Sequence, residues 1–529
     1  MHILYKAKIF TQEPGHLHAS AMMIDNGRIV AVGEDSGILA AASSGALKSN
    51  LDGKVVWPGL IDAHIHLQNY AASLQFVDCE TGTRQECLGR VAERARKTSP
   101  HTWIRGHGWN QNSWPEGFGD ASDLDCVAAA NPVYLTAKSM HASWANSLAL
   151  QKAGITASTP DPKSGKIVRD NAGQPTGILL ESAMELVEKV IPPPSNEDIS
   201  QQIYEAQSRL WKMGVTGVHD YDQASCFSAL QMLQWEGKLS LRVLKGIPYE
   251  VMPHAIAAGL RSGFGNEFLR IGSVKLFADG ALGPRTAAML APYENETEYS
   301  GFPFLDAEQI YEIGQEATRN GLSLATHAIG DRANHEVINA YAQLREFETS
   351  QNLPHRRHRI EHVQLLHPDD VNRLAVYHII ASMQPIHATS DMLMADRQWG
   401  SRSAYAYAWH SLLQNKTLLA FGSDAPVESP NPFWGIYAAV TRRRLDGQPG
   451  SEGWYPQQRI TLQNALAAYT LGPAFAAGNE KCQGKLAPGY YADLIVLDKD
   501  PFSMPVADLA ALQPMATMVS GEWVWQSLD

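Results

Sequence analysis

The chain has 529 residues, of which 44% are hydrophobic, 19% charged and 9% aromatic, and its formal net charge is −12. This length predicts about two to four domains, and the composition excludes a disordered or collagen-like chain. An acidic chain without a Lys/Arg-rich run binds nucleic acid and anionic membranes poorly, so neither is an expected partner.

The cysteines and the N-terminal segment indicate a cellular compartment. The five cysteines are scattered and never occur in a Cys-x-x-Cys spacing, which argues against a disulfide framework and a thiolate zinc site. No basic stretch followed by an apolar run predicts a signal peptide, and no run of ~18 apolar residues predicts a membrane span. We therefore expect a cytoplasmic protein, for which a homodimer is the commonest assembly.

Both ends of the chain are predicted to be rich in β-strands. Residues 1–57 alternate apolar and polar side chains, and Asn26-Gly27 is typical of a type I′ hairpin turn. Residues 476–529 have the same character in GYYADLIVLD and ATMVSGEWVWQ. We infer that the two ends pair into one small composite β-sandwich domain.

Residues 58–475 alternate short apolar runs with segments of helical spacing. Eight runs end in polar or glycine residues: WPGLIDAHIHL, GVTGVHDYD, LRVLKGIP, RIGSVKLFADG, LSLATHAIGD, HRIEHVQL, HIIASMQP and LLAFGSDAP. Strands that alternate with helices in this number predict an α/β fold of the (β/α)8 TIM-barrel type. The gap between the first two runs is far longer than one βα unit. An insertion, of the kind that forms lids or small subdomains, is therefore predicted at about 70–195.

Six side chains that can bind a metal fall at the C-terminal ends of the predicted strands, where barrel enzymes carry their chemistry. They are His64, His66, Lys275, His327, His362 and Asp424. The His-x-His pair directs both imidazoles to one face, because side chains on a strand alternate. A single histidine at a strand end is more often a hydrogen-bonded structural residue. The metal interpretation therefore depends on the convergence of the whole set.

The motifs PGLIDAHIHL, VKLFADG, THAIGDRA, IEHVQ and FGSDAP resemble those of the amidohydrolase superfamily, and specifically amidohydrolase family 3. The resemblance extends over essentially the whole chain, from about residue 20 to ADLIVLD and the strand after it. It implies a metal-binding barrel with a composite β-sandwich, in agreement with the strand count.

The resemblance also implies a ligand set. By it, His64 and His66 would bind the more buried ion, and His327 and His362 the more exposed one. Asp424 would bind the first ion and act as the proton shuttle. The imidazole and carboxylate ligands suit zinc, and equally manganese, iron or nickel, so we expect one or two divalent ions, with zinc as the first choice.

Lys275 has two interpretations. By the resemblance it would react with carbon dioxide, and the resulting carbamate would bridge the two ions. An ammonium group beside two divalent cations is disfavoured, which favours the neutral amine that can react. The alternative is a lysine of the barrel interior that pairs with Asp279 or Asp424.

The expected reaction is hydrolysis of the C–N bond of an amide, a formamide or an N-acyl compound. A metal-activated water, whose pKa is lowered to ~7, would attack the carbonyl carbon of a small-molecule substrate. Asp424 would take the proton and return it to the leaving nitrogen, first as a general base and then as a general acid.

Further residues are candidates for substrate binding. Arg285 follows the fourth strand and could hold a carboxylate or a developing oxyanion, although a solvated loop arginine is an equal alternative. Asp279 could orient Lys275 or Arg285. In the insertion, three candidates would favour a bulky or apolar substrate group. They are Trp109, His141 and Trp144.

Three polar residues are predicted to support the metal ligands from outside. His219 and Asp220 end the second strand and are expected to orient ligands, because the ligand set is already full. Asp331 follows His327 by one helical turn and could orient a histidine, or instead cap the next helix.

Three other functions were weighed against the amidohydrolase. A deaminase of a heterocyclic ring, with one metal, needs a glutamate after the fifth strand, where this chain has Ala328, Ile329 and Gly330. A non-catalytic scaffold protein of the superfamily loses metal ligands, whereas this chain retains them. An isomerase or decarboxylase that only polarises a carbonyl has no distinguishing signal in the sequence.

Overall fold

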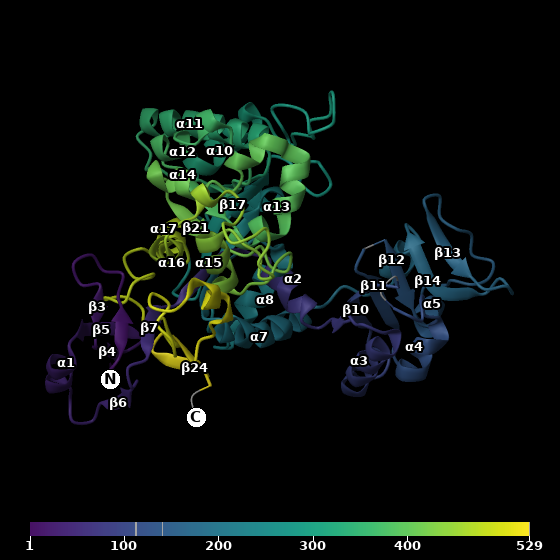
Figure 1. The fold of residues 1–529 in the computed structure, drawn as a ribbon, viewed down its shortest axis with the longest axis horizontal. Coiled ribbons are helices and arrows are strands. Elements are labelled where there is room, and N and C mark those ends of the chain that lie inside the picture. The colour runs from purple at the N-terminus through teal and green to yellow at the C-terminus, as the bar shows by residue number, and fades with distance from the viewer. Residues whose placement is uncertain (112–113, 140, 528–529) are drawn as a thin grey trace. The chain divides into compact units, whose positions relative to one another are not determined.

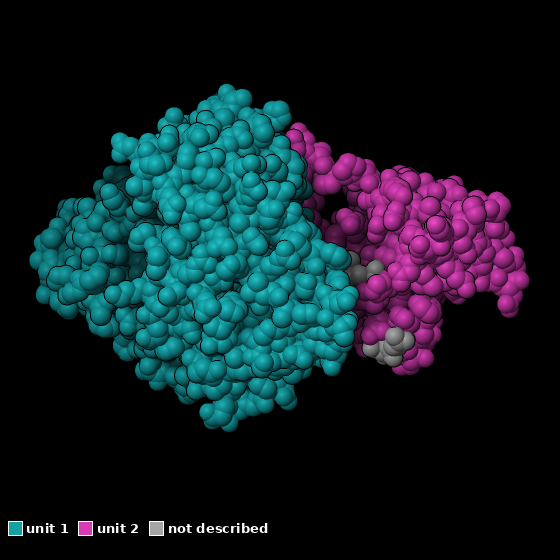
Figure 2. Space-filling view, turned by 90° about the horizontal axis from the view of Figure 1, so that it is seen from above, with its two compact units in different colours: residues 1–70, 203–529 teal, residues 71–202 magenta. Residues whose placement is uncertain are grey.

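The computed structural model describes residues 1–111, 114–139 and 141–527. The chain forms two compact units, which Figure 2 shows in different colours. Unit 1 comprises residues 1–70 and 203–529, and unit 2 comprises residues 71–202, where the sequence placed an insertion at about 70–195. Within the described residues, no helix has both the length and the apolar character needed to cross a membrane.

The centre of unit 1 is an eight-stranded parallel sheet with its strands in sequence order (Figure 1). The strands are β8 (Leu60–Ile65), β15 (Val215–Asp220), β16 (Arg242–Pro248), β17 (Leu269–Phe277), β18 (Leu324–Ala328), β19 (Arg359–His362), β20 (Ile380–Met383) and β21 (Leu419–Phe421). The first and last strands, β8 and β21, are joined just after the C-terminal end of β21, where the amides of Ser423 and Asp424 donate to the carbonyl of His64 in β8. Seven strands lie within the runs predicted for them, and β17 begins one residue before its run, at Leu269; the TIM-type barrel is confirmed.

Helices alternate with the strands. They are α2 (Leu67–Ser73), α7 (Asn196–Lys212), α8 (Ala224–Trp235), α9 (Met252–Ala257), α10 (Ala307–Arg319), α11 (Asp331–Ser350), α12 (Arg373–Val376), α13 (Pro385–Trp399), α14 (Trp409–Gln414), α15 (Pro432–Thr441), α16 (Leu462–Ala468) and α17 (Leu471–Ala476). Helix α10 shows why these segments are helical: Asp306 and Gln309 form a capping box, and Ile310, Gly314 and Ala317 are buried on one face.

Two further sheets of unit 1 form the composite β-domain. One has the order β5 (Arg28–Gly33), β4 (Ala21–Asp25), β1 (His2–Tyr5), β6 (Leu47–Asn50). The helix α1 (Asp35–Ala41) lies between β5 and β6 in the sequence. The other has the order β24 (Glu522–Gln526), β23 (Ala516–Val519), β22 (Leu494–Leu497), β7 (Val55–Pro58), β2 (Lys8–Phe10), β3 (His18–Ala19). Antiparallel pairing of β7 with β22 joins the two ends of the chain. Asn26 and Gly27 have φ of 48° and 76°, as the predicted hairpin requires.

A buried ion pair connects the barrel to the composite β-domain. On β16, the Arg242 guanidinium donates to both carboxylate oxygens of Asp493, at 2.6 and 2.9 Å, and it stacks on the ring of Tyr491. Both charged side chains are about 5% exposed. Removal of one partner from such a pair leaves a buried charge without compensation.

We expect Asp493→Asn to lower the free energy of unfolding by about 3–5 kcal/mol. The matched control is Glu267→Gln, which breaks the exposed ion pair of Glu267 with Arg28 between the same two parts of the chain. This control should change stability by less than about 1 kcal/mol. Thermal and denaturant unfolding followed by circular dichroism measure both. Equal effects of the two substitutions would contradict the importance of the buried pair.

Unit 2 is built on a mixed six-stranded sheet. Its order is β13 (Gly165–Arg169), β14 (Pro175–Glu181), β12 (Ala142–Ala145), β11 (Val133–Ala137), β10 (Ile104–Trp109), β9 (Val77–Asp78). Its helices are α3 (Arg84–Lys97), α4 (Ala121–Ala128), α5 (Ser147–Lys152) and α6 (Glu185–Glu188). Apolar side chains of this sheet and these helices form clusters of their own. The insertion is therefore a folded subdomain and not a long loop.

Candidate metal centre

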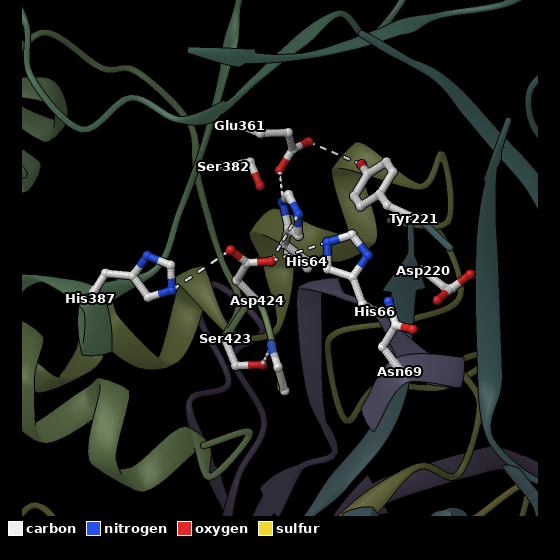
Figure 3. A network of polar contacts seen from close by, with 12 residues as sticks. His64, His66, Asn69, Asp220, Tyr221, Glu361, Ser382, His387, Ser423 and Asp424 are labelled. Atoms are coloured by element: carbon white, nitrogen blue, oxygen red, sulfur yellow. Dashed lines mark hydrogen bonds and ion pairs between the residues drawn. The ribbon is translucent and has the colours of Figure 1, made fainter. Parts of the chain in front are cut away.

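Three of the predicted ligands meet at one point of the barrel mouth (Figure 3). The Asp424 Oδ1 atom lies 3.5 Å from Nε2 of His64 and 3.3 Å from Nε2 of His66. His64, His362 and Asp424 each offer one ligand atom, and these atoms lie within 4.8 Å of one another. Two nitrogen donors and one oxygen donor at this spacing can coordinate a single divalent cation.

His327 and His362 complete the group of imidazoles. The His362 ring centroid lies 4.5 Å from that of His327 and 5.0 Å from that of His64. His327 donates from Nε2 to the carbonyl of Gly280 at 2.8 Å, so its Nδ1 carries the lone pair. The Nδ1 atom of His362 is buried and has no hydrogen-bond partner among the described residues. Because buried polar atoms are normally hydrogen-bonded, an unpartnered nitrogen among other donors fits a metal ligand.

The backbone at the ends of β19 and β21 is strained. His362, Val363 and Asp424 have φ of 74°, 46° and 61°, a left-handed conformation that non-glycine residues rarely adopt. Each such residue costs about 1–3 kcal/mol and persists only where the surrounding structure imposes it. Two of these three residues, His362 and Asp424, are candidate ligands, so the strained backbone lies at the candidate metal centre.

The buried imidazoles are held in the neutral form that binds metals. Burial lowers the pKa of His64 to about 4 and that of His327 to about 3, and the nearby charge of Lys275 adds to both effects. Burial also holds the pKa of His362 well below its usual value. These three side chains therefore present lone pairs at neutral pH.

The carboxylate at the centre is ionised. Burial opposes the charge of Asp424, but His64 and the other surrounding histidines outweigh it and hold its pKa well below the usual range. Burial likewise lowers the pKa of His66, but Asp222 and Asp424 overcome it and raise that pKa to about 10. The two carboxylates around His66 therefore stabilise a positive charge at this point, whether a proton or a metal ion carries it.

Lys275 lies beside this group at the end of β17. Its side chain is 4% exposed, and its Nζ atom lies 4.9 Å from the ring centroids of both Tyr221 and Phe277. Burial lowers the pKa of the amine to about 8. The ion pairs of Asp279 and Asp424 are with histidines, so the structure does not show the lysine paired with either carboxylate.

Glu361 supports His64 and is absent from the sequence-predicted set. Its Oε2 atom accepts from Nδ1 of His64 at 2.6 Å, and its Oε1 atom accepts from the hydroxyl of Tyr221 at 3.0 Å. The Arg359 guanidinium pairs with the same carboxylate, and both side chains are at most 1% exposed. Burial opposes ionisation, but Arg359 and His64 hold the pKa of Glu361 well below its usual range. This carboxylate fixes the tautomer of His64, with Nε2 facing the site.

Asp222, which follows β15, has the same role toward His66. It accepts from Nδ1 of His66 at 3.2 Å and from the backbone amides of Gln68 and Asn69. Its sequence signal is weak, because Asp222 lies past the end of the strand, in the turn before α8. The two ligands of the His-x-His pair are thus each oriented by a buried carboxylate.

His387 also faces the group and was not predicted. It lies on α13, directly after β20, and its Nε2 atom is 3.9 Å from Oδ2 of Asp424. The Nε2 atom is buried without a hydrogen-bond partner, and the ring stacks on His362. No strand periodicity marks this residue, because it belongs to a helix.

Asp279 organises the backbone around His327. Its carboxylate accepts the amides of Ala288, Ile329 and Gly330, which ties the loop after β17 to the loop after β18. The carboxylate is fully buried, and burial raises its pKa to about 7. Its nearest contact with a candidate ligand is Oδ1 to Nε2 of His327, at 3.7 Å.

Arg285 is engaged by its own loop. The guanidinium forms an ion pair with Glu296 at 2.7 Å and lies 5.1 Å from the ring centroid of Tyr293. Both side chains of this pair are about one-third exposed, so it is a weak surface ion pair. In the structure Arg285 contacts residues of its own loop, and its role in substrate binding stays a prediction.

The three predicted supporting residues differ in their distance from the ligands. His219 accepts a hydrogen bond from Arg359 at 2.8 Å and so contacts the network of Glu361. Asp220 forms a buried ion pair with Lys245. Asp331 is the first residue of α11 and accepts backbone amides, one of them from the loop after β17, without contacting a histidine.

The insertion candidates lie in unit 2. Trp109 and Trp144 are 1% and 0% exposed, and their indole N–H groups donate to backbone carbonyls of unit 2. Both indoles therefore pack the core of that unit, which is why the sequence is rich in tryptophan there. His141 is exposed and pairs with Glu181.

Comparison with known proteins gives a consistent family. The model of the amidohydrolase family, named Amidohydro_3, matches residues 49–525. The chain is 33% identical to the putative amidohydrolase YtcJ of Bacillus subtilis, over 90% of both chains. It is 28% identical to the N-substituted formamide deformylase of Arthrobacter pascens, over 98% of this chain and 97% of that one. Among solved structures, an uncharacterized metal-dependent hydrolase of Pyrococcus furiosus has 29% identity and a TM-score of 0.77, over 95% of this chain and all of the other. The barrel, the donor cluster and these matches together show that the chain belongs to the amidohydrolase family.

Proposed function

We propose that this hydrolase uses a divalent metal to cleave the C–N bond of an amide, a formamide or an N-acyl compound. One observation carries the proposal: His64, His362 and Asp424 present ligand atoms within 4.8 Å of one another, with one buried imidazole nitrogen left without a partner. The similarity to a formamide deformylase supports the choice of bond.

The residues present fit a divalent cation. The donors are imidazole nitrogens and a carboxylate oxygen, which suit zinc as well as manganese, iron and nickel. His66, His327 and Lys275 border the same group and would complete the coordination of one or two ions. When bound, the metal lowers the pKa of a water and polarises the substrate carbonyl.

Asp424 is the residue that moves the proton. Its carboxylate is ionised and stands between the imidazoles, so it can accept the proton of the attacking water. The water oxygen forms the new bond to the carbonyl carbon while the C–N bond breaks, and Asp424 returns its proton to the leaving nitrogen. Glu361 and Asp222 keep the two imidazoles of β8 oriented throughout.

We propose further that Lys275 is carboxylated. A buried amine that has no carboxylate partner at hydrogen-bond distance within the described part of the chain, beside a cluster of metal donors, is placed to react with carbon dioxide and to supply an anionic ligand. Nuclear magnetic resonance of zinc-loaded protein with isotopically labelled bicarbonate tests this, with Lys275→Ala as the control. A carbamate resonance that is absent from the control supports the proposal, and no such resonance contradicts it.

Metal removal should abolish hydrolysis. We expect chelator-treated protein to lose activity on N-substituted formamides and acetamides, and added zinc or manganese to restore it. Amine release from a panel of these amides, with metal content measured in parallel, checks the prediction. Equal rates in metal-free and metal-loaded protein would show that the site has another purpose.

A further inference from the structure

A cavity of about 390 Å³ lies at the barrel mouth, entirely within unit 1. Its lining comes from the C-terminal ends of four neighbouring strands, β8, β15, β16 and β17, and from the loop before α10. His66, Asp222 and Lys275 line one part, so the cavity reaches the metal centre. Its remaining walls are what a bound substrate would contact.

Phe277 forms a wall of the cavity beside the metal centre. It is the last residue of β17 and lies two positions beyond Lys275, so the alternation of the strand places both side chains on the same inward face. Its ring centroid is 5.4 Å from that of His327. Phe277 is nevertheless 49% exposed, although Leu276 on the opposite face is 1% exposed. A large exposed aromatic ring beside a catalytic site is an apolar surface for a ligand to cover.

Two more exposed aromatic rings line the same cavity. Phe304 is 54% exposed, and its amide donates to the carbonyl of Ala278, which fixes its loop to the end of β17. Tyr249 begins the short helix after β16 and is 40% exposed. Three exposed aromatic side chains, each from a separate segment at the barrel mouth, therefore line the same cavity.

Outside the metal centre, the charges around the cavity are unfavourable for an anion. Among the described residues that line it, there is no arginine, and the two basic side chains, Lys275 and His66, both belong to the metal centre. Asp222 and Glu250 contribute carboxylates. Arg285, the nearby cation that could have bound a substrate carboxylate, forms an ion pair with Glu296 and is not part of the lining.

We propose that the substrate is an uncharged amide that carries an aromatic or similarly bulky apolar group, and that a free carboxylate next to the amide is excluded. The apolar group would pack against Phe277, Phe304 and Tyr249 while the amide carbonyl faces the metal centre. This inference rests on the proposed function for its reaction, but the shape and charge of the cavity carry it independently.

Three acetamides test the proposal: N-phenethylacetamide, N-ethylacetamide, which lacks the ring, and N-acetylphenylalanine, which adds a carboxylate. We expect kcat/KM for the phenethyl compound to exceed that of each of the others about 10- to 100-fold. The same series of formamides gives a second set of ratios. A preference for the carboxylate compound, or no preference for the ring, would overturn the proposal.

Variants assign the preference to the cavity. Phe277→Ala should reduce the phenethyl-to-ethyl ratio about tenfold, because it removes an exposed ring beside the metal centre. The matched control is Phe302→Ala, since Phe302 is also exposed and lies in the same loop as Phe304 but does not line the cavity. Glu250→Gln should lower the ratio of kcat/KM for N-phenethylacetamide to kcat/KM for N-acetylphenylalanine. An unchanged ratio in Phe277→Ala would contradict the assignment.

A binding measurement separates this inference from the proposed reaction. In the ketone analogues, a methylene replaces the amide nitrogen, so there is no C–N bond to cleave. Calorimetry on zinc-loaded protein should show tighter binding of the phenethyl ketone than of the ethyl ketone, with loss of the difference in Phe277→Ala. If no amide is hydrolysed, the proposed function fails, and this binding difference alone decides the inference. Equal affinities for the two ketones would overturn it.

Discussion

Replacement of Glu361 by glutamine is expected to lower the zinc affinity about 10- to 100-fold, because this carboxylate orients His64 toward the metal. The same change leaves the buried Arg359 guanidinium without its ion-pair partner, which should lower the free energy of unfolding by about 3–5 kcal/mol. Competition with a chelator measures the affinity, and denaturant unfolding measures the stability.

A second buried glutamate provides the matched control. Glu348, near the end of α11, is fully buried and binds an arginine, Arg345, at 2.6 Å and a histidine, His358, at 3.2 Å. It therefore has the same kinds of partner as Glu361, an arginine and a histidine, but it does not contact the candidate ligands. Glu348→Gln should destabilise the protein while leaving the zinc affinity unchanged. If Glu361→Gln also retained full zinc affinity, Glu361 would be only a structural residue.

Asp424→Asn should lower kcat for amide hydrolysis about 100- to 10,000-fold. The asparagine keeps the size of the side chain but cannot accept the proton of the attacking water. Rates measured at saturating zinc separate this loss from a weaker affinity for the metal. The control is Asp331→Asn, since Asp331 binds only backbone amides at the start of α11 and should leave kcat within about twofold. A rate near that of the unmodified enzyme in Asp424→Asn would assign the proton transfer to another residue.

The barrel could be predicted because its strands carry strong local signals. Each strand is a short apolar run that stops at a polar or glycine residue, and the stopping point is where the barrel mouth lies. That register places His64, His66, His327, His362 and Asp424 at or just past the ends of their strands, next to the mouth, although alternation alone does not decide where each side chain points. The convergence of these imidazoles around Asp424 is the spatial expression of that pattern.

The supporting residues could not be predicted in the same way. Arg359 and Glu361 are inward-facing charges on β19, and a sequence does not distinguish an inward charge from a solvated one without the partner across the barrel. His387 reaches Asp424 from a helix, and Asp222 reaches His66 from a turn. These contacts depend on tertiary placement and have no local period.

The aromatic residues could be identified from the sequence, but which of them are exposed could not. The tryptophans of the insertion favoured a substrate wall, yet Trp109 and Trp144 pack the core of unit 2. The exposed rings beside the metal centre are instead those of Phe277, Phe304 and Tyr249. Composition indicates that aromatic groups are present, whereas only the fold decides which of them remain uncovered.

The metal centre is tested most directly by an anomalous diffraction map at the zinc absorption edge, from crystals of protein purified with zinc and without chelator. We expect strong density for one or two ions enclosed by the six ligands predicted from the sequence, which are His64, His66, Lys275, His327, His362 and Asp424. We also expect the density to disappear in His64→Ala. A map without a peak at this position, or with its metal bound elsewhere in the chain, would contradict the metal centre and the hydrolytic function proposed from it.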